Sequence, residues 1–178
     1  MWPWGHLAVA YLLYTLYTRG RYGRPPRSGP AIALAVGSQF PDLIDKPLAW
    51  WLGVLPGGRT LAHSLLFAAV LFPGVYALGI RLDRLEAATA FAIGHLSHLL
   101  ADLPPLLLAG YLRGSEFLLW PLLAQPTFAP DDTLFDAPAG LEAVSLTLAD
   151  PAVYGRFQIA LFVLAAVVWY VDGAPGLE

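Results

Sequence analysis

The segment Gly94-His95-Leu96-Ser97-His98-Leu99-Leu100-Ala101-Asp102 places three side chains of metal-binding type inside an otherwise apolar stretch. In a helix, which turns by about 100° per residue, His95, His98 and Asp102 fall within an arc of about 60°. The three side chains therefore share one helix face. An ionisable group within a membrane is costly unless it is paired or ligated, so this face predicts a bound metal ion.

The composition of the whole chain is typical of a membrane protein. Of its 178 residues, 57% are hydrophobic and 13% are charged, and the mean hydropathy is +0.60, whereas soluble domains are roughly 25% charged. The chain contains no cysteine, which excludes disulfides and thiolate ligands and leaves His, Asp and Glu to hold a metal. Such ligands suit zinc, which we expect, or manganese or magnesium. A net charge of −3 argues against a nucleic-acid-binding surface.

Apolar segments separated by charged or proline-rich loops predict an all-α, polytopic bundle of membrane helices that forms a single domain over residues 1–178. The second span is expected to be interrupted between Pro41 and Pro47, and Thr60 is expected to cap the third. The expected parts are spans at 2–18, 30–55, 61–80 and 85–103, a re-entrant or interfacial segment at 117–123, an acidic loop at about 126–156, and a last helix at about 157–172 that crosses the membrane or packs along the bundle.

The expected orientation follows from the basic residues. The arginine-rich loop 19–27 is the most basic part of the chain, and the positive-inside rule places it in the cytoplasm, with the N-terminus outside. In this topology the polar side chains of four segments lie in the outer half of the membrane. The metal-site core is therefore expected within residues 2–123.

Asp42 and Asp45 are the candidate catalytic pair, since they stand about one helical turn apart. Two such carboxylates can bridge two metal ions, or one can bind a metal while the other acts as general base. The alternative is a structural role, in which Asp42 is a helix N-cap after Pro41 and Asp45 forms an ion pair with Lys46.

The histidines differ in how specifically they indicate a metal. His98 and Asp102 form the more specific half of the opening segment, whereas His95 is a ligand, a partner of a ligand or a group that contacts substrate. His63 and His6 are further candidate ligands. Either of them can also be an ordinary histidine near a membrane interface.

Five short motifs follow one another in order from about residue 4 to residue 123. They are His6, Pro41-Asp42-x-x-Asp45, Arg59-Thr60-x-x-His63-Ser64, Gly94-His95-x-x-His98-x-x-x-Asp102 and Leu118-Leu119-Trp120-Pro121. This ordered set resembles the YdjM-like family of membrane-bound, metal-dependent hydrolases, which is distantly similar to the zinc-dependent phospholipase C and single-strand nuclease superfamily. The resemblance implies an all-helical membrane protein and a metal site formed by His6, Asp42, His63, His98 and Asp102, with Asp45 and His95 left open.

These features together predict a membrane-embedded hydrolase that uses a metal-activated water on a phosphoester or lipid-like substrate drawn from membrane lipid. Arg59 is a candidate for binding an anionic group of that substrate, or else a snorkelling arginine at a helix start. The main alternative is a membrane protein that uses the same His and Asp groups for ion or proton binding and transport. A haem protein with two axial histidines and a scaffold built on the acidic region are further alternatives.

Overall fold

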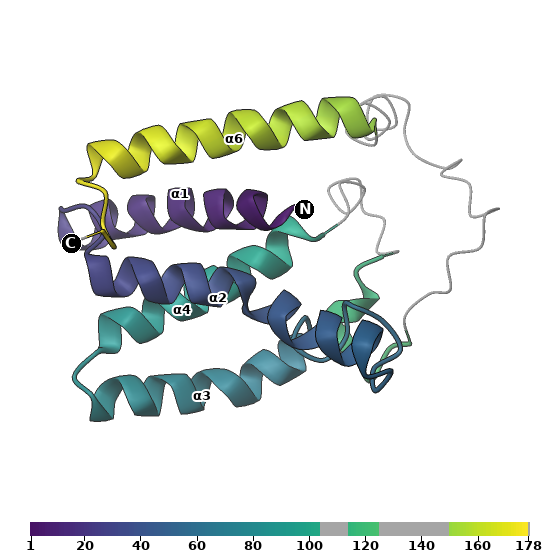
Figure 1. The fold of residues 1–178 in the computed structure, drawn as a ribbon. Coiled ribbons are helices and arrows are strands. Elements are labelled where there is room, and N and C mark those ends of the chain that lie inside the picture. The colour runs from purple at the N-terminus through teal and green to yellow at the C-terminus, as the bar shows by residue number, and fades with distance from the viewer. Residues whose placement is uncertain (104–113, 125–149, 178) are drawn as a thin grey trace.

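The computed structural model describes residues 1–103, 114–124 and 150–177, and within them every regular element is a helix (Figure 1). The predicted all-α class is therefore confirmed for this part of the chain. The predicted acidic loop, apart from its last residues 150–156, lies outside the described residues. The longer helices are α1 (Pro3–Tyr22), α2 (Ser28–Lys46), α3 (Leu65–Arg81), α4 (Leu85–Ala101) and α6 (Pro151–Val171), and the short ones are the π-helical η1 (Pro47–Trp51) and the 3₁₀ helix η3 (Glu116–Leu119).

Helix α4 is the central element of the bundle. It packs against α1, α2 and α3, while α6 packs on α1. Figure 1 shows α6 and α3 on opposite sides of the molecule, with the other three long helices between them. The beginnings of α1, α3 and α6 and the ends of α2 and α4 consequently lie toward one end of the bundle.

The contact between α2 and α4 is very close because glycines lie where the two helices cross. A Cβ atom on Gly94 would lie 2.4 Å from the carbonyl oxygen of Leu34, and one on Gly37 would lie 2.3 Å from the carbonyl oxygen of Phe91. Glycine is thus required at both positions for the backbones to approach this closely.

Most buried side chains of the bundle are small or polar, with a few large ones such as Tyr14 and Leu34, whereas many large apolar side chains face outward. Alanine is the commonest residue among the buried apolar ones. Side chains that are two-thirds or more exposed include Leu16, Val70, Ile80, Tyr170 and Val171. Many exposed large apolar side chains around buried polar ones are typical of helices surrounded by lipid.

The C-terminal helix is longer than predicted. It begins at Pro151 rather than near residue 157, because the Asp150 side chain caps it by accepting hydrogen bonds from the backbone N–H groups of Ala152 and Val153. Within the described part of the chain, Ala152–Val171 is the one helix that is long and apolar enough to cross a membrane, and Leu65–Arg81 is a shorter apolar helix.

Helix α6 is held to α1 by a buried carboxylate at its C-terminal end. Asp172 accepts hydrogen bonds from Tyr11 at 2.9 Å and Thr15 at 2.7 Å, and it also pairs with Arg19. The predicted basic loop 19–27 is therefore partly helical. Helix α1 continues to Tyr22 because Arg19 is tied to Asp172 rather than released into a loop.

The predicted interruption of the second segment lies later than expected. Helix α2 continues through Pro41 and leaves regular α-helical geometry only at Pro47, where η1 begins. A proline removes one backbone hydrogen bond, but close packing against a neighbouring helix can compensate for that loss. Asp42 and Asp45 are consequently both carried by a continuous helix.

The third helix begins four residues later than predicted. Ser64, not Thr60, is its N-cap, since the Ser64 hydroxyl oxygen accepts a hydrogen bond from the Leu66 N–H at 3.1 Å. His63 therefore lies in the loop before α3 rather than in its first turn. The segment 117–123, expected to be re-entrant or interfacial, consists of the end of η3 and a turn.

The glycine contact generates a stability prediction. Gly94→Ala should destabilise the protein by about 1–3 kcal/mol or more, because the added methyl group meets backbone atoms that cannot rotate away. The measurement is thermal unfolding of the purified protein in detergent. Gly74→Ala within α3 is the control, since nothing lies within 4 Å of its added Cβ, and it should be neutral or stabilising by up to about 1 kcal/mol. Equal effects of the two substitutions would contradict the prediction.

Candidate metal centre

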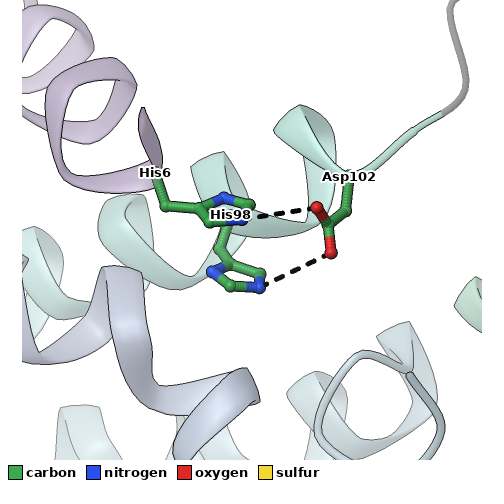
Figure 2. Close-up of side chains that lie close together, drawn as sticks. All are labelled: His6, His98 and Asp102. Carbon is green, nitrogen blue, oxygen red and sulfur yellow. Dashed lines mark ion pairs between the residues drawn. The ribbon is translucent and has the colours of Figure 1, made fainter. Parts of the chain in front are cut away.

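Five polar side chains that are distant in sequence meet at the end of the bundle where α1 begins and α4 ends. All are buried except Asp42, which is slightly exposed. Figure 2 shows three of them, contributed by α1 and by the end of α4. The five are His6 from the first turns of α1, Asp42 from α2, His63 from the loop before α3, His98 from the last turn of α4, and Asp102 at its C-cap.

Two imidazole nitrogens lie side by side in this cluster, and a carboxylate oxygen of Asp42 and one of Asp102 each approach both of them. His63 Nε2 and His98 Nε2 are 3.1 Å apart. Asp42 Oδ1 lies 3.6 Å from the first nitrogen and 3.7 Å from the second, and Asp102 Oδ2 lies at the same two distances. Ligands at about 2.0–2.1 Å from a tetrahedral zinc ion are about 3.3 Å from one another. The spacing between the two nitrogens, and the spacing of each carboxylate oxygen from both nitrogens, are close to that value.

Hydrogen bonds on the far side of each imidazole determine which nitrogen faces the centre. His98 Nδ1 donates to the Ser38 carbonyl oxygen at 2.6 Å, and His63 Nδ1 donates to Asp45 Oδ2 at 2.8 Å. In its neutral form each ring therefore presents the lone pair of Nε2 to the other. Two lone pairs at this distance, flanked by two carboxylates, repel one another, so the arrangement fits a cation at the centre.

Asp45 lies behind His63 and is not among the converging ligand atoms. Its Oδ2 accepts hydrogen bonds from the Thr60 N–H at 2.8 Å and from the His63 ring, and its Oδ1 accepts one from the Ala62 N–H at 2.8 Å. The carboxylate is fully buried. Its oxygens are thus occupied by the loop, so Asp45 is the group that orients the His63 ring.

One carboxylate oxygen of Asp42 faces the centre, and the other contacts Lys46. Its Oδ2 accepts a hydrogen bond from Lys46 Nζ at 2.5 Å. The sequence alternative paired Lys46 with Asp45, but residues four apart share a helix face whereas adjacent ones do not. The N-cap alternative for Asp42 is also wrong, since this residue lies inside α2.

Asp102 also belongs to a second group of ligand atoms. Its Oδ1 lies 3.3 Å from His6 Nε2, and the His6 ring stacks on the His98 ring with 3.7 Å between centroids (Figure 2). In the described part of the chain, His6, His98 and Asp102 form one group whose ligand atoms lie within 4.8 Å of each other, and Asp42, His63 and His98 form another. The two groups share His98, so they are parts of one centre.

His95 belongs to neither group, although helix periodicity places it on the face of His98. Its ring lies among aromatic side chains, with centroids 6.0 Å from Phe40, 5.4 Å from Phe72 and 6.3 Å from Phe91. It is fully buried, and neither ring nitrogen hydrogen bonds to a described residue. His95 stands three residues before His98 on α4, so its side chain is rotated by about 60° around the helix. This difference is enough to direct its ring into an aromatic environment.

Two further cationic groups contact Asp102. Arg59 Nε lies 2.9 Å from Oδ2, and the Met1 amino group lies 3.0 Å from Oδ1. The sequence suggested Arg59 as a substrate-binding residue, and the structure places it at the centre. The contacts of the Met1 amino group and of the Ser38 carbonyl oxygen could not be predicted from the sequence, because backbone groups are the same in every residue type.

The electrostatics of the centre favour positive charge. Burial disfavours the charged form of His63, but the nearby carboxylates of Asp102, Asp42 and Asp45 outweigh it and raise its pKa to about 10. The carboxylates thus stabilise a proton on this ring. A bound metal cation would take the place of that proton, since ligating histidines must be neutral.

The fold and this centre together define a membrane-associated helical protein with buried His and Asp side chains that could hold a metal ion. The model of the YdjM inner membrane protein family matches residues 1–173, and the chain belongs to this family. The family resemblance predicted from the motifs is therefore confirmed. Comparisons with curated proteins and with solved structures give no significant match.

The position of Asp45 generates a prediction about metal affinity. Asp45→Asn should weaken zinc binding by about 10- to 100-fold, because the amide cannot accept all the hydrogen bonds that hold the His63 ring and its loop. The measurement is competition with a chromophoric zinc chelator. Glu86→Gln is the matched control, since this carboxylate pairs with Arg24 outside the centre. Unchanged affinity in Asp45→Asn would contradict the orienting role.

Proposed function

We propose that this protein is a polytopic, membrane-embedded, metal-dependent hydrolase that acts on a phosphoester or lipid-like substrate. The observation that carries the proposal is that Asp42 Oδ1 and Asp102 Oδ2 each lie 3.6–3.7 Å from both His63 Nε2 and His98 Nε2, which are 3.1 Å apart. Membership of an inner membrane protein family supports the membrane part of the proposal.

The donor set fits a divalent metal. The imidazole and carboxylate groups of His63, His98 and Asp102 suit zinc, and manganese or magnesium less well. A zinc ion held there would lower the pKa of a bound water toward 7 and polarise a phosphoryl oxygen. His6, on the far side of Asp102, extends the donor set toward a second metal position.

The two candidate catalytic carboxylates receive different roles in this proposal. Asp45 positions His63, because its hydrogen bonds already occupy both oxygens. Asp42 is partly accessible and held by Lys46. If His63, His98 and Asp102 were the three protein ligands of a catalytic zinc site, Asp42 would remain as the carboxylate that could accept a proton from the attacking water.

The polytopic arrangement is supported by the outward-facing apolar side chains and the buried polar ones. The basic residues Arg19, Arg21 and Arg24 lie at the end of α1, away from the centre near His6. The positive-inside rule then places the basic end in the cytoplasm and the metal centre on the outer side. Exposed Trp50 and Trp51 lie near the centre, in η1, where an aromatic belt would meet the interface.

The hydrolase is tested by the activity and metal content of protein purified in detergent. His98→Ala and Asp102→Ala should each lower kcat/KM for phosphoesters by about 10³-fold or more and reduce the bound zinc, because each removes one metal ligand. His95→Phe is the matched control on the same helix and should keep its zinc. Retained turnover in the doubly substituted protein, or ion flux into liposomes without any turnover, would overturn the proposal.

The orientation is tested with single cysteines, since the natural chain contains none. In intact cells, a membrane-impermeant thiol reagent should label Trp51→Cys and leave Arg21→Cys unlabelled until the membrane is permeabilised. Both positions are exposed in the structure, so accessibility to the reagent depends on the side of the membrane. Labelling of Arg21→Cys alone from outside would reverse the assigned orientation.

A further inference from the structure

We infer that Arg59 binds the anionic phosphoryl group of the substrate, so that the substrate is a charged phosphoester rather than a neutral ester. This inference rests on the proposed function, which it extends to the chemistry of substrate recognition. It goes beyond the metal ligands to a residue whose position beside them is defined by the structure.

The guanidinium of Arg59 contacts the centre with only one of its nitrogens. Nε lies 2.9 Å from Asp102 Oδ2, and the side chain is 49% exposed. No other ion pair or hydrogen bond connects this guanidinium to the described residues. The two terminal nitrogens, which carry four N–H donors, are therefore available to a ligand.

The geometry of the guanidinium places a bound anion next to the metal ligands. A guanidinium is planar and binds phosphate oxygens through pairs of parallel N–H donors. Asp102 Oδ2, which Nε contacts, also lies 3.6 Å from His63 Nε2 and 3.7 Å from His98 Nε2. An oxyanion held by the terminal nitrogens of Arg59 would thus lie beside the centre.

The backbone that carries Arg59 is fixed by the same group that orients His63. The following residue, Thr60, donates its N–H to Asp45 Oδ2 at 2.8 Å, and its hydroxyl donates to the Gly57 carbonyl oxygen at 3.1 Å. Ala62 N–H also donates to Asp45. The anion-binding arginine and the metal-binding histidine are therefore held in a fixed relation, as preorganised recognition requires.

Charge at the edge of the centre also favours an anionic substrate. Lys46 Nζ contacts Asp42 Oδ2 on one side, and Arg59 contacts Asp102 on the other. Both cationic side chains are partly exposed, with 33% and 49% of their surface accessible. A neutral ester would make no use of this paired positive charge, whereas a phosphoryl group would be attracted to it.

The first test measures binding of inorganic phosphate to the zinc-loaded full chain by calorimetry. Arg59→Ala should weaken phosphate binding by about 10- to 100-fold, as expected for the loss of charge-assisted hydrogen bonds, and Arg59→Lys should restore only part of it. Arg156→Gln is the control for general attraction of anions, since Arg156 is an exposed arginine near the start of α6. Equal weakening in the Arg59 and Arg156 variants, or no phosphate binding by the natural chain, would overturn the inference.

The second test separates substrate recognition from a merely structural role of Arg59. Arg59→Ala should raise KM about 10-fold or more for a soluble phosphomonoester or for a phospholipid in mixed micelles, while KM for a neutral carboxylic ester stays unchanged. The substrate that shows the larger effect identifies the source of the phosphate. An equal loss with charged and neutral esters would overturn the inference. Absence of all turnover in the natural chain would instead count against the proposed hydrolase function. The phosphate titration would still test whether Arg59 binds the anion.

Discussion

The hydrogen bonds to the Asp45 carboxylate are the constraint on which the centre depends. This buried side chain of α2 accepts from the backbone of Thr60 and Ala62 and from the His63 ring. It ties a loop with no regular structure to the end of a helix, and in doing so it satisfies buried N–H groups and fixes a ring orientation at once. The same loop supplies His63 and Arg59, so this one carboxylate helps to position both.

The second constraint is the close approach of α2 and α4. Gly37 and Gly94 let the two backbones meet, and the same crossing places the Ser38 carbonyl against His98 Nδ1. The helix crossing therefore also fixes the orientation of the His98 ring. Helices that are surrounded by lipid associate through such contacts between small residues, because the hydrophobic effect does not drive their association there.

Much of the architecture and the residues that meet at the centre could be predicted from the sequence. Burying an ionisable side chain in an apolar chain costs free energy, so each such residue indicates that it is paired or ligated. The boundaries were less predictable. Thr60 and Ser64 are both good N-caps, and a tertiary contact to Asp45 decides between them. Periodicity placed His95 beside His98, but it carries no information on which neighbouring helix each ring meets. Backbone acceptors such as the Ser38 carbonyl are invisible in residue types altogether.

The bond between His98 and residue 38 has a consequence for sequence variation in this family. The acceptor is a main-chain oxygen, which every amino acid supplies, so the identity of the side chain at position 38 does not encode the orientation of the histidine. Ser38 is fully buried at the helix crossing, so the close packing there limits the size of the side chain at this position. Alanine, serine and glycine at position 38 would therefore orient the His98 ring equally well. A search for the centre based on polar side chains would not identify this position, although its carbonyl oxygen fixes the ring.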